Sequence, residues 1–244
     1  MLFTTKLNKA ATLGCTMAIG LAISGVAQAT TYSAASDFSI SSNPNGVWSY
    51  LYSNTLLSST LSPGTWEAWW SGGAVPNSII VGQATSGSVS DGTVQFGTSY
   101  LTMDPESQTV DVRFTAPFAG TYTITGEFFG ADNQNNCSPN CAAHPVLITD
   151  SLSGTIFGPE TISTYLQTYT FSLTETLVAG ELVNFIAETG TSGGCSYCNL
   201  STGLEATISS TPLPSAWIIM LTGLAGLGFV AYRRQKDHTS LASA

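Results

Sequence analysis

Short runs of β-branched and aromatic residues, separated by clusters of Gly, Pro, Asn and Ser, fill the chain between residues 30 and 211. This pattern is typical of antiparallel β-proteins, and no charged amphipathic helix pattern of useful length interrupts it. About 180 residues are enough for one domain with its own core. We therefore predict an all-β fold, an antiparallel two-sheet sandwich of the jelly-roll type. The predicted strands are residues 37–40, 47–52, 66–70, 78–81, 99–103, 110–115, 120–129, 146–149, 167–174, 182–188 and 204–209.

The segment 110–129 shows the clearest alternation. Val110, Val112 and Phe114 alternate with polar residues, and Tyr122 and Ile124 do the same after an Ala-Pro-Phe-Ala-Gly turn at 116–120. One face of each run is therefore apolar, and the other is expected to face water. We predict that the two runs form a β-hairpin.

Both ends of the chain carry membrane-targeting patterns. Lys6 and Lys9 lead into an apolar stretch and an A-x-A cleavage site at 27–29, which together predict a secretory signal peptide helix. Residues 216–232 hold no charge and are followed by Arg233, Arg234 and Lys236, which predicts a short transmembrane helix with a cytoplasmic end. The expected organisation is a signal peptide at 1–29, an exported β-sandwich domain at 30–211, a C-terminal signal at 212–236 and a cytoplasmic tail at 237–244.

The stretch Pro212-Leu213-Pro214 stands just before the apolar run. Its two prolines keep it extended outside the bilayer, in a form that a processing enzyme binds as an added strand. With the Gly-Leu-Ala-Gly-Leu-Gly helix segment at 223–228 and the Arg233-Arg234 pair, it resembles the PEP-CTERM sorting signal of Gram-negative, exopolysaccharide-producing bacteria. Leu213 replaces the central Glu of the family. The resemblance implies an exosortase partner, a membrane cysteine enzyme that removes the tail, whereas the alternative is an ordinary single-span anchor.

A second resemblance covers most of residues 43–208. The segments 112–117 (VRFTAP), 119–122 (AGTY) and 126–130 (GEFFG) are similar to the core of a β-sandwich domain common in PEP-CTERM cargo, and residues 45–50, 179–185 and 201–204 fit the same picture. Such domains resemble carbohydrate-binding and other extracellular jelly rolls without a shared catalytic site. The resemblance implies a non-enzymatic cell-surface or extracellular-matrix protein of an exopolysaccharide producer, which passes through an inner-membrane intermediate. A carbohydrate-binding module retained at the surface is the alternative.

The exported segment is acidic. The chain has 15 Asp and Glu against 6 Lys and Arg, and Arg113 is the only cation between Thr30 and Ser215. Nucleic acids are excluded as partners, because phosphate binding needs clustered cations.

Four cysteines, Cys137, Cys141, Cys195 and Cys198, remain once Cys15 leaves with the signal peptide. An even set in an oxidising compartment predicts disulfides, with three connectivities open. The same spacing also satisfies a four-cysteine zinc site, and a redox-active C-x-x-C pair is the third alternative.

Two further patterns bear on chemistry. Residues 190–194 (GTSGG) match the G-x-S-x-G nucleophile pattern, but that elbow needs a strand-turn-helix context and a later His, and His144 is the only His of the exported segment. We therefore predict no catalytic residue.

Asp132, Asn133 and Asn135 offer hard oxygens to calcium, although such loops more often form turns. No other cofactor is expected.

Aromatic residues concentrate in the first third of the exported domain. Exposed rings stack on sugar faces, so Trp66, Trp69 and Trp70 beside Glu67 are candidate residues for binding an extracellular polysaccharide. Large aromatic side chains also dominate protein cores, and core packing is the alternative for most of these rings.

Overall fold

The computed structural model of the chain describes residues 29–72, 80–105, 108–133, 143–190, 201–212, 223–224 and 226–228. The chain divides into two compact units, one of residues 27–214 and one of residues 1–26 with 215–244. The described residues of the second unit are helical. Within the described part of the chain, no helix has the length and apolar character needed to cross a membrane. The predicted signal peptide, apart from Ala29, and most of the predicted helix at 216–232 lie outside the described residues.

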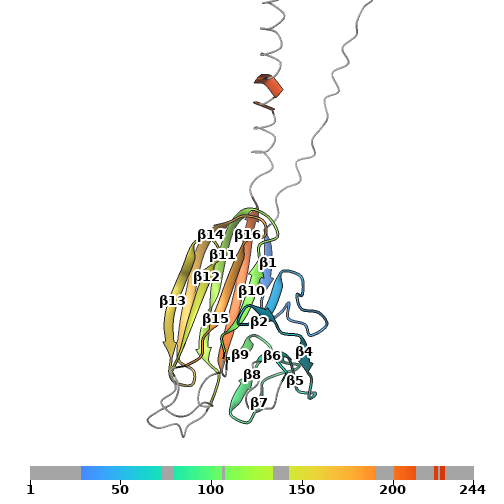
Figure 1. Cartoon of the computed structure of the whole chain (residues 1–244), viewed down its shortest axis with the longest axis vertical. Coiled ribbons are helices and arrows are strands. Elements are labelled where there is room, and N and C mark those ends of the chain that lie inside the picture. The colour runs from blue at the N-terminus through green and yellow to red at the C-terminus, as the bar shows by residue number, and fades with distance from the viewer. Residues whose placement is uncertain are drawn as a thin grey trace, which may run out of the picture. The chain divides into compact units, whose positions relative to one another are not determined.

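The unit of residues 27–214 is built from antiparallel strands, most of them in two large sheets (Figure 1). The prediction of an all-β antiparallel sandwich is thereby confirmed. The eight-stranded sheet has the order β14-β11-β16-β9-β6-β5-β4, and β1 also pairs with β16. Its strands are β1 (Thr30–Ser33), β4 (Ser59–Leu61), β5 (Trp66–Trp70), β6 (Ile80–Ala84), β9 (Leu101–Asp104), β11 (Gly120–Gly130), β14 (Thr168–Leu177) and β16 (Thr202–Pro212).

The second large sheet has six strands in the order β13-β12-β15-β10-β2-β3. A separate two-stranded sheet pairs β7 with β8. The strands of these two sheets are β2 (Trp48–Tyr52), β3 (Thr55–Leu56), β7 (Val89–Asp91), β8 (Val94–Phe96), β10 (Val110–Thr115), β12 (His144–Asp150), β13 (Gly154–Ile162) and β15 (Leu182–Ala187).

The main core lies between the two large sheets, because alternate residues of their strands point inward. Phe114 of β10 meets Tyr122 of β11 at a ring-centroid distance of 5.8 Å and Trp48 of β2 at 5.4 Å. All three rings are fully buried. Full burial of one such large apolar side chain contributes on the order of 1.5–3 kcal/mol, so these rings anchor the two layers to each other.

The predicted hairpin of residues 110–129 is wrong, since β10 and β11 belong to different sheets. β10 pairs with β2 and β15, whereas β11 pairs with β14 and β16. The connection is held at Ala116, whose N–H donates to Glu181 O and whose carbonyl accepts from Gly180 N, both at 2.8 Å. A hairpin would set the two apolar faces side by side in one sheet, whereas this crossing presses them together across the core.

Two other predictions about strands are corrected. Residues 37–40 are not a strand, because a turn in which Asp37 N–H donates to Ser33 O leads into an irregular segment that packs Phe38 and Ile40 against the core. Conversely, the predicted strands did not include β13, whose Gly158 and Pro159 are residues typical of turns. Instead they lie inside a strand that pairs with β12 through register shifts.

A smaller apolar cluster lies on the other side of β5. It contains Trp66, Ala68, Ala84 and Phe96, and the rings of Trp66 and Phe96 stack at 4.7 Å. The neighbouring residue Trp69 points the opposite way and joins the main core. Strand β5 is therefore buried on both faces.

Candidate functional site

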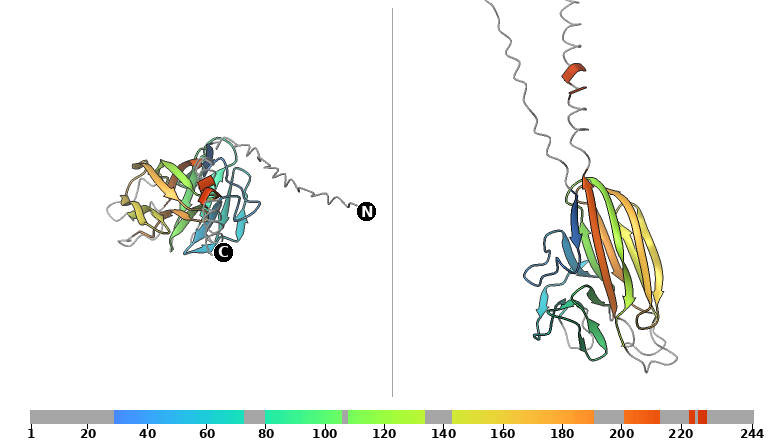
Figure 2. Two further views of the ribbon diagram at one scale, coloured as in Figure 1. Left: turned by 90° about the horizontal axis from the view of Figure 1, so that it is seen from above. Right: turned by 180° about the vertical axis from the view of Figure 1, so that it is seen from behind.

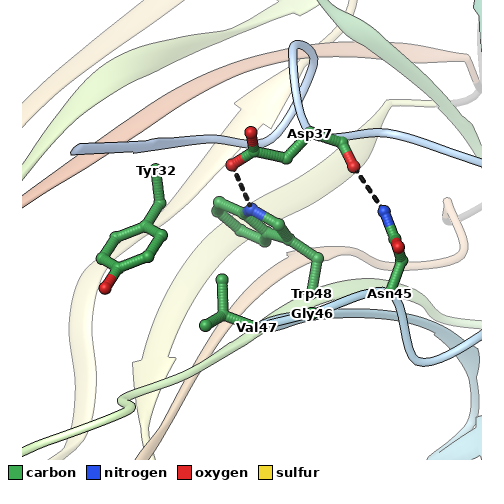
Figure 3. A pocket seen from close by; sticks show the side chains of 6 residues that line it. All are labelled: Tyr32, Asp37, Asn45, Gly46, Val47 and Trp48. Carbon is green, nitrogen blue, oxygen red and sulfur yellow. Dashed lines mark hydrogen bonds between the residues drawn. The ribbon is translucent and has the colours of Figure 1, made fainter. Parts of the chain in front are cut away.

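A pocket of about 430 Å³ opens beside the start of β2 (Figure 3). Three short segments form it: β1, the turn that follows β1, and the turn that leads into β2. Its lining residues are Tyr32, Asp37, Asn45, Gly46, Val47 and Trp48. None of these six residues is a cation.

Backbone geometry fixes the lower rim of this pocket. Asn45 and Trp48 exchange two backbone hydrogen bonds, of 2.8 and 3.0 Å, and so close a tight turn around Gly46. Gly46 has a φ of 59°, a conformation that glycine adopts at no steric cost. The Asn45 Nδ2 also donates to the backbone oxygen of Asp37 at 2.6 Å, which ties this turn to the one after β1. The two turns therefore hold each other in place.

The carboxylate of Asp37 is the charged group of the pocket. Its Oδ2 accepts hydrogen bonds from Trp48 Nε1 at 3.2 Å and from Ser33 N at 2.9 Å, as Figure 3 shows for the indole. Because Trp48 is fully buried and Asp37 is exposed, a rigid indole orients a carboxylate that remains open to solvent. Within the described residues, the second oxygen Oδ1 accepts no hydrogen bond and is free to accept one from a ligand.

Tyr32 supplies an aromatic wall. Its ring is half-buried and rests on Phe114 of the main core at 5.3 Å, so its position is set by packing. Val47 adds a half-buried aliphatic side chain next to it. The pocket thus combines an apolar wall with a carboxylate and an amide, an arrangement that accepts hydrogen bonds from hydroxyl groups and packs against C–H faces.

The three tryptophans proposed from the sequence lie elsewhere. Trp66 is 7% exposed and Trp69 is 6% exposed, and each ring packs into one of the two apolar clusters. The Trp69 Nε1 donates to Ser39 O at 2.8 Å. Neither ring offers a free face for stacking on a sugar. Trp70, at the end of β5, is half-buried.

The candidate calcium ligands are only partly described. Asp132 is buried at 4% exposure, Asn133 is exposed, and Asn135 lies outside the described residues. Asp150, the next carboxylate along the chain, accepts from Leu152 N and Ser153 N at 2.7 and 2.8 Å and so closes a turn. Among the described residues, no three His, Cys, Asp or Glu side chains gather into a metal site.

His144 begins β12 and is fully buried, and its Nε2 forms a hydrogen bond with the hydroxyl of Thr202, which is also buried. This hydrogen bond joins β12 to β16 inside the sandwich, and neither side chain reaches the surface. The Gly-rich pattern that completes at 191–194 and the four cysteines lie outside the described residues. The residues that flank the two cysteine segments are neighbours, however, since Ala131 N donates to Ser201 O at 2.8 Å and Glu188 N donates to Pro145 O at 2.9 Å.

The pocket itself was missed by sequence reasoning. Its residues come from three turns and strand ends, and β1 reaches its place only by pairing with β16, as Thr30 does with Ser210. The one local signal was the Asn45-Gly46 pair, which is typical of a tight turn between strands. Nothing in the local sequence pattern indicates that Tyr32 and Asp37 meet that turn.

No protein-family model matches the sequence, and no curated protein matches it. Solved structures of several carbohydrate-binding modules are similar to it at low identity. A CBM35 module from Paenibacillus barcinonensis is 10% identical over 75% of this chain and 99% of its own, with a TM-score of 0.28. The CBM22-1 xylan-binding domain from the same organism is 12% identical over 75% of this chain and 94% of its own, with a TM-score of 0.32. A family 35 module from Clostridium thermocellum is 10% identical over 76% of this chain and all of its own, with a TM-score of 0.27.

Proposed function

We propose that this chain is an exported, non-enzymatic cell-surface or matrix protein whose jelly-roll-type sandwich binds a neutral polysaccharide. The binding site is the pocket formed by Tyr32, Asp37 and Asn45. The observation that supports it is the Asp37 carboxylate, which the buried Trp48 indole orients at 3.2 Å while it stays exposed beside a half-buried Tyr ring.

Several physical features favour a neutral glycan over other ligands. Sugar hydroxyls donate to a carboxylate, and such charge-assisted hydrogen bonds are about twice as strong as neutral ones. The turns that carry Asp37 and Asn45 are already tied together by the 2.6 Å bond between them, so little ordering is needed on binding. An anionic glycan would meet the Asp37 carboxylate without a cation among the lining residues. Neutral sugars are therefore the expected class.

Isothermal titration calorimetry of the full chain in detergent against matched neutral and acidic oligosaccharides tests this proposal. Asp37→Asn keeps an oxygen for the Trp48 indole but removes the charge, and we expect it to weaken binding by about tenfold. Tyr32→Ala removes the aromatic wall and should weaken binding by a similar factor. Asp91→Asn, an identical change at an exposed carboxylate of β7, is the control and should leave the affinity unchanged.

Two results would contradict the proposal. One is tighter binding of the acidic oligosaccharides than of the neutral ones. The other is a neutral ligand whose affinity is the same for the wild type and Asp37→Asn.

We further propose that the chain is exported and then sorted by an exosortase through Pro212, Leu213, Pro214, Arg233 and Arg234. The support comes from the sequence: an A-x-A site at 27–29, the Pro-Leu-Pro stretch and the apolar run with its basic end. The intact mass of the unreduced protein from cells and medium tests it. Loss of both ends is expected, with a deficit of about four hydrogens for two disulfides. A mass that retains residues 216–244 would indicate a plain membrane anchor.

A further inference from the structure

Strand β14 forms one margin of the eight-stranded sheet (Figure 1). It pairs with β11 from Thr168 to Leu177, and no other described strand pairs with it. Gly130 N donates to Gln167 O at 3.0 Å, so these two residues form a hydrogen-bonded pair next to the β11–β14 ladder. Along an antiparallel ladder, hydrogen-bonded pairs alternate with pairs that are not hydrogen-bonded. The odd-numbered residues of β14 therefore bond to β11. The even-numbered residues turn their N–H and C=O groups toward the open edge, and these are Thr168, Thr170, Ser172, Thr174 and Thr176.

The neighbouring edge of the other sheet is built differently. Strand β13, which precedes β14 in the chain and lies at the same side of the sandwich, contains Pro159 and has register shifts against β12 (Figure 2). Gly158 also takes a φ of 76° there. Proline, bulges and distortion are the devices by which natural edge strands avoid pairing with other chains.

Strand β14 has none of these protections. Its ten residues, TYTFSLTETL, include no Pro, Gly or Lys, and Glu175 is the only charged residue. Threonine and aromatic residues, which favour the strand conformation, make up most of it. A regular, exposed edge of this length is a template for strand addition.

We propose that the open edge of β14 pairs antiparallel with β14 of a second copy of this chain, about a two-fold axis near Ser172. Such an edge is self-complementary, because the same alternating donors and acceptors face each other across the axis. In this register Glu175 lies opposite Tyr169 of the other copy, so the acidic side chains do not face each other. The two eight-stranded sheets become one continuous sheet across the dimer, while β13 and its proline keep the six-stranded sheets apart.

Charge favours this occupant in a second way. The exported domain is acidic overall, with Arg113 as its only cation, so most of its surfaces repel a second copy. Between Thr168 and Thr174 the edge carries no charge at all. Two copies can therefore meet along this uncharged segment without placing carboxylates opposite each other.

The test compares two lysine substitutions on the full chain in detergent. Ser172→Lys sets two lysines against each other at the axis, whereas Thr123→Lys adds the same charge to the same face on the interior strand β11. Sedimentation analysis over a concentration series should show a dimer for the wild type and Thr123→Lys. Ser172→Lys should raise the dimer dissociation constant by about tenfold or more.

Hydrogen exchange locates the contact. The amides of Thr170, Ser172 and Thr174 should exchange more slowly as the wild-type concentration rises, and this dependence should vanish in Ser172→Lys.

Ser172→Pro is a second variant, since it removes a donor on the open edge without removing a bond to β11. A monomeric wild type at all concentrations would overturn the proposal, and so would equal association of wild type and Ser172→Lys. Protection that develops only with a different protein would assign the edge to that partner and would likewise overturn self-pairing.

Discussion

The two outer faces of the sandwich share one alternating sequence pattern but have different surroundings. On the eight-stranded sheet, Thr123 of β11 is exposed, and its register partners Thr174 and Ser209 continue a row of hydroxyl side chains. On the six-stranded sheet, Asp111 of β10 is only 6% exposed, and its partner Leu51 is 2% exposed. The alternation thus assigns a residue to the outward side of its sheet but does not decide whether water reaches it.

We expect the largest effect of this difference in burial at Asp111, where it makes the free energy of unfolding depend on pH. Desolvation raises the pKa of this carboxyl from 3.8 to about 6, although the nearby Arg113 lowers it in part. The folded state therefore binds the proton more tightly than the unfolded chain does, so the contribution of Asp111 to stability is fully present below about pH 3.8 and is lost as the pH rises through about 6. The shift corresponds to about 3 kcal/mol, because each pKa unit is about 1.4 kcal/mol.

Asp111→Asn should remove this dependence and raise the free energy of unfolding above pH 6 by up to about 3 kcal/mol. Urea denaturation between pH 4 and pH 8 measures it, and Asp91→Asn on an exposed strand is the matched control. Parallel stability profiles for the wild type and Asp111→Asn would show that Asp111 is as well hydrated as Thr123.

We expect the next largest effect on the free energy of unfolding from a substitution of Arg113, on the same face of the six-stranded sheet. Its Nε donates to Asn184 Oδ1 at 2.6 Å and its Nη2 donates to Asn54 Oδ1 at 2.5 Å. Arg113→Gln loses both charge-assisted bonds and the cation that favours ionised Asp111, so we expect a loss of about 1–3 kcal/mol at pH 7.

The pH dependence separates the two contributions of Arg113. At pH 4 most of Asp111 is protonated in the folded state, so the loss should shrink to that of the two hydrogen bonds. In the Asp111→Asn background it should be equally small at both pH values. An unchanged loss at pH 4 and pH 7 would mean that Arg113 does not act on Asp111.

The alternation of a strand shows on which side a residue lies but not what surrounds it, and this explains what the sequence could and could not predict. Alternation placed Phe114 and Tyr122 on inward faces correctly, because periodicity reports which side of a strand is apolar. It could not say that β10 and β11 belong to different sheets, since a hairpin and a crossing share the same local pattern. Trp66 and Trp69 were ambiguous for a related reason, because β5 lies between two apolar clusters and is buried on both sides.

The candidate site was less predictable than the core. Tyr32 and Asp37 meet the turn at Asn45 only after β1 pairs with β16, across 180 residues from Thr30 to Ser210. Such long-range pairing is set by the whole fold and leaves no trace in a local window. β13 was missed for the opposite reason, because the local signals of Gly158 and Pro159 are overridden by its pairing with β12.

Thr123 provides the smallest expected effect and the sharpest contrast with Asp111. Its side chain is exposed in the middle of the hydroxyl face, so replacing the hydroxyl by a methyl group in Thr123→Val leaves no buried polar group unpaired. Valine also keeps the branched shape that suits a strand. The free energy of unfolding should change by no more than about 0.5 kcal/mol, as is usual for surface substitutions, and should not depend on pH. Urea denaturation of this variant beside Asp111→Asn measures both outward positions by one method. A loss well above this value would mean that the hydroxyl row is held by bonds between its side chains, and the outer face of the eight-stranded sheet would then be as ordered as the face that carries Asp111.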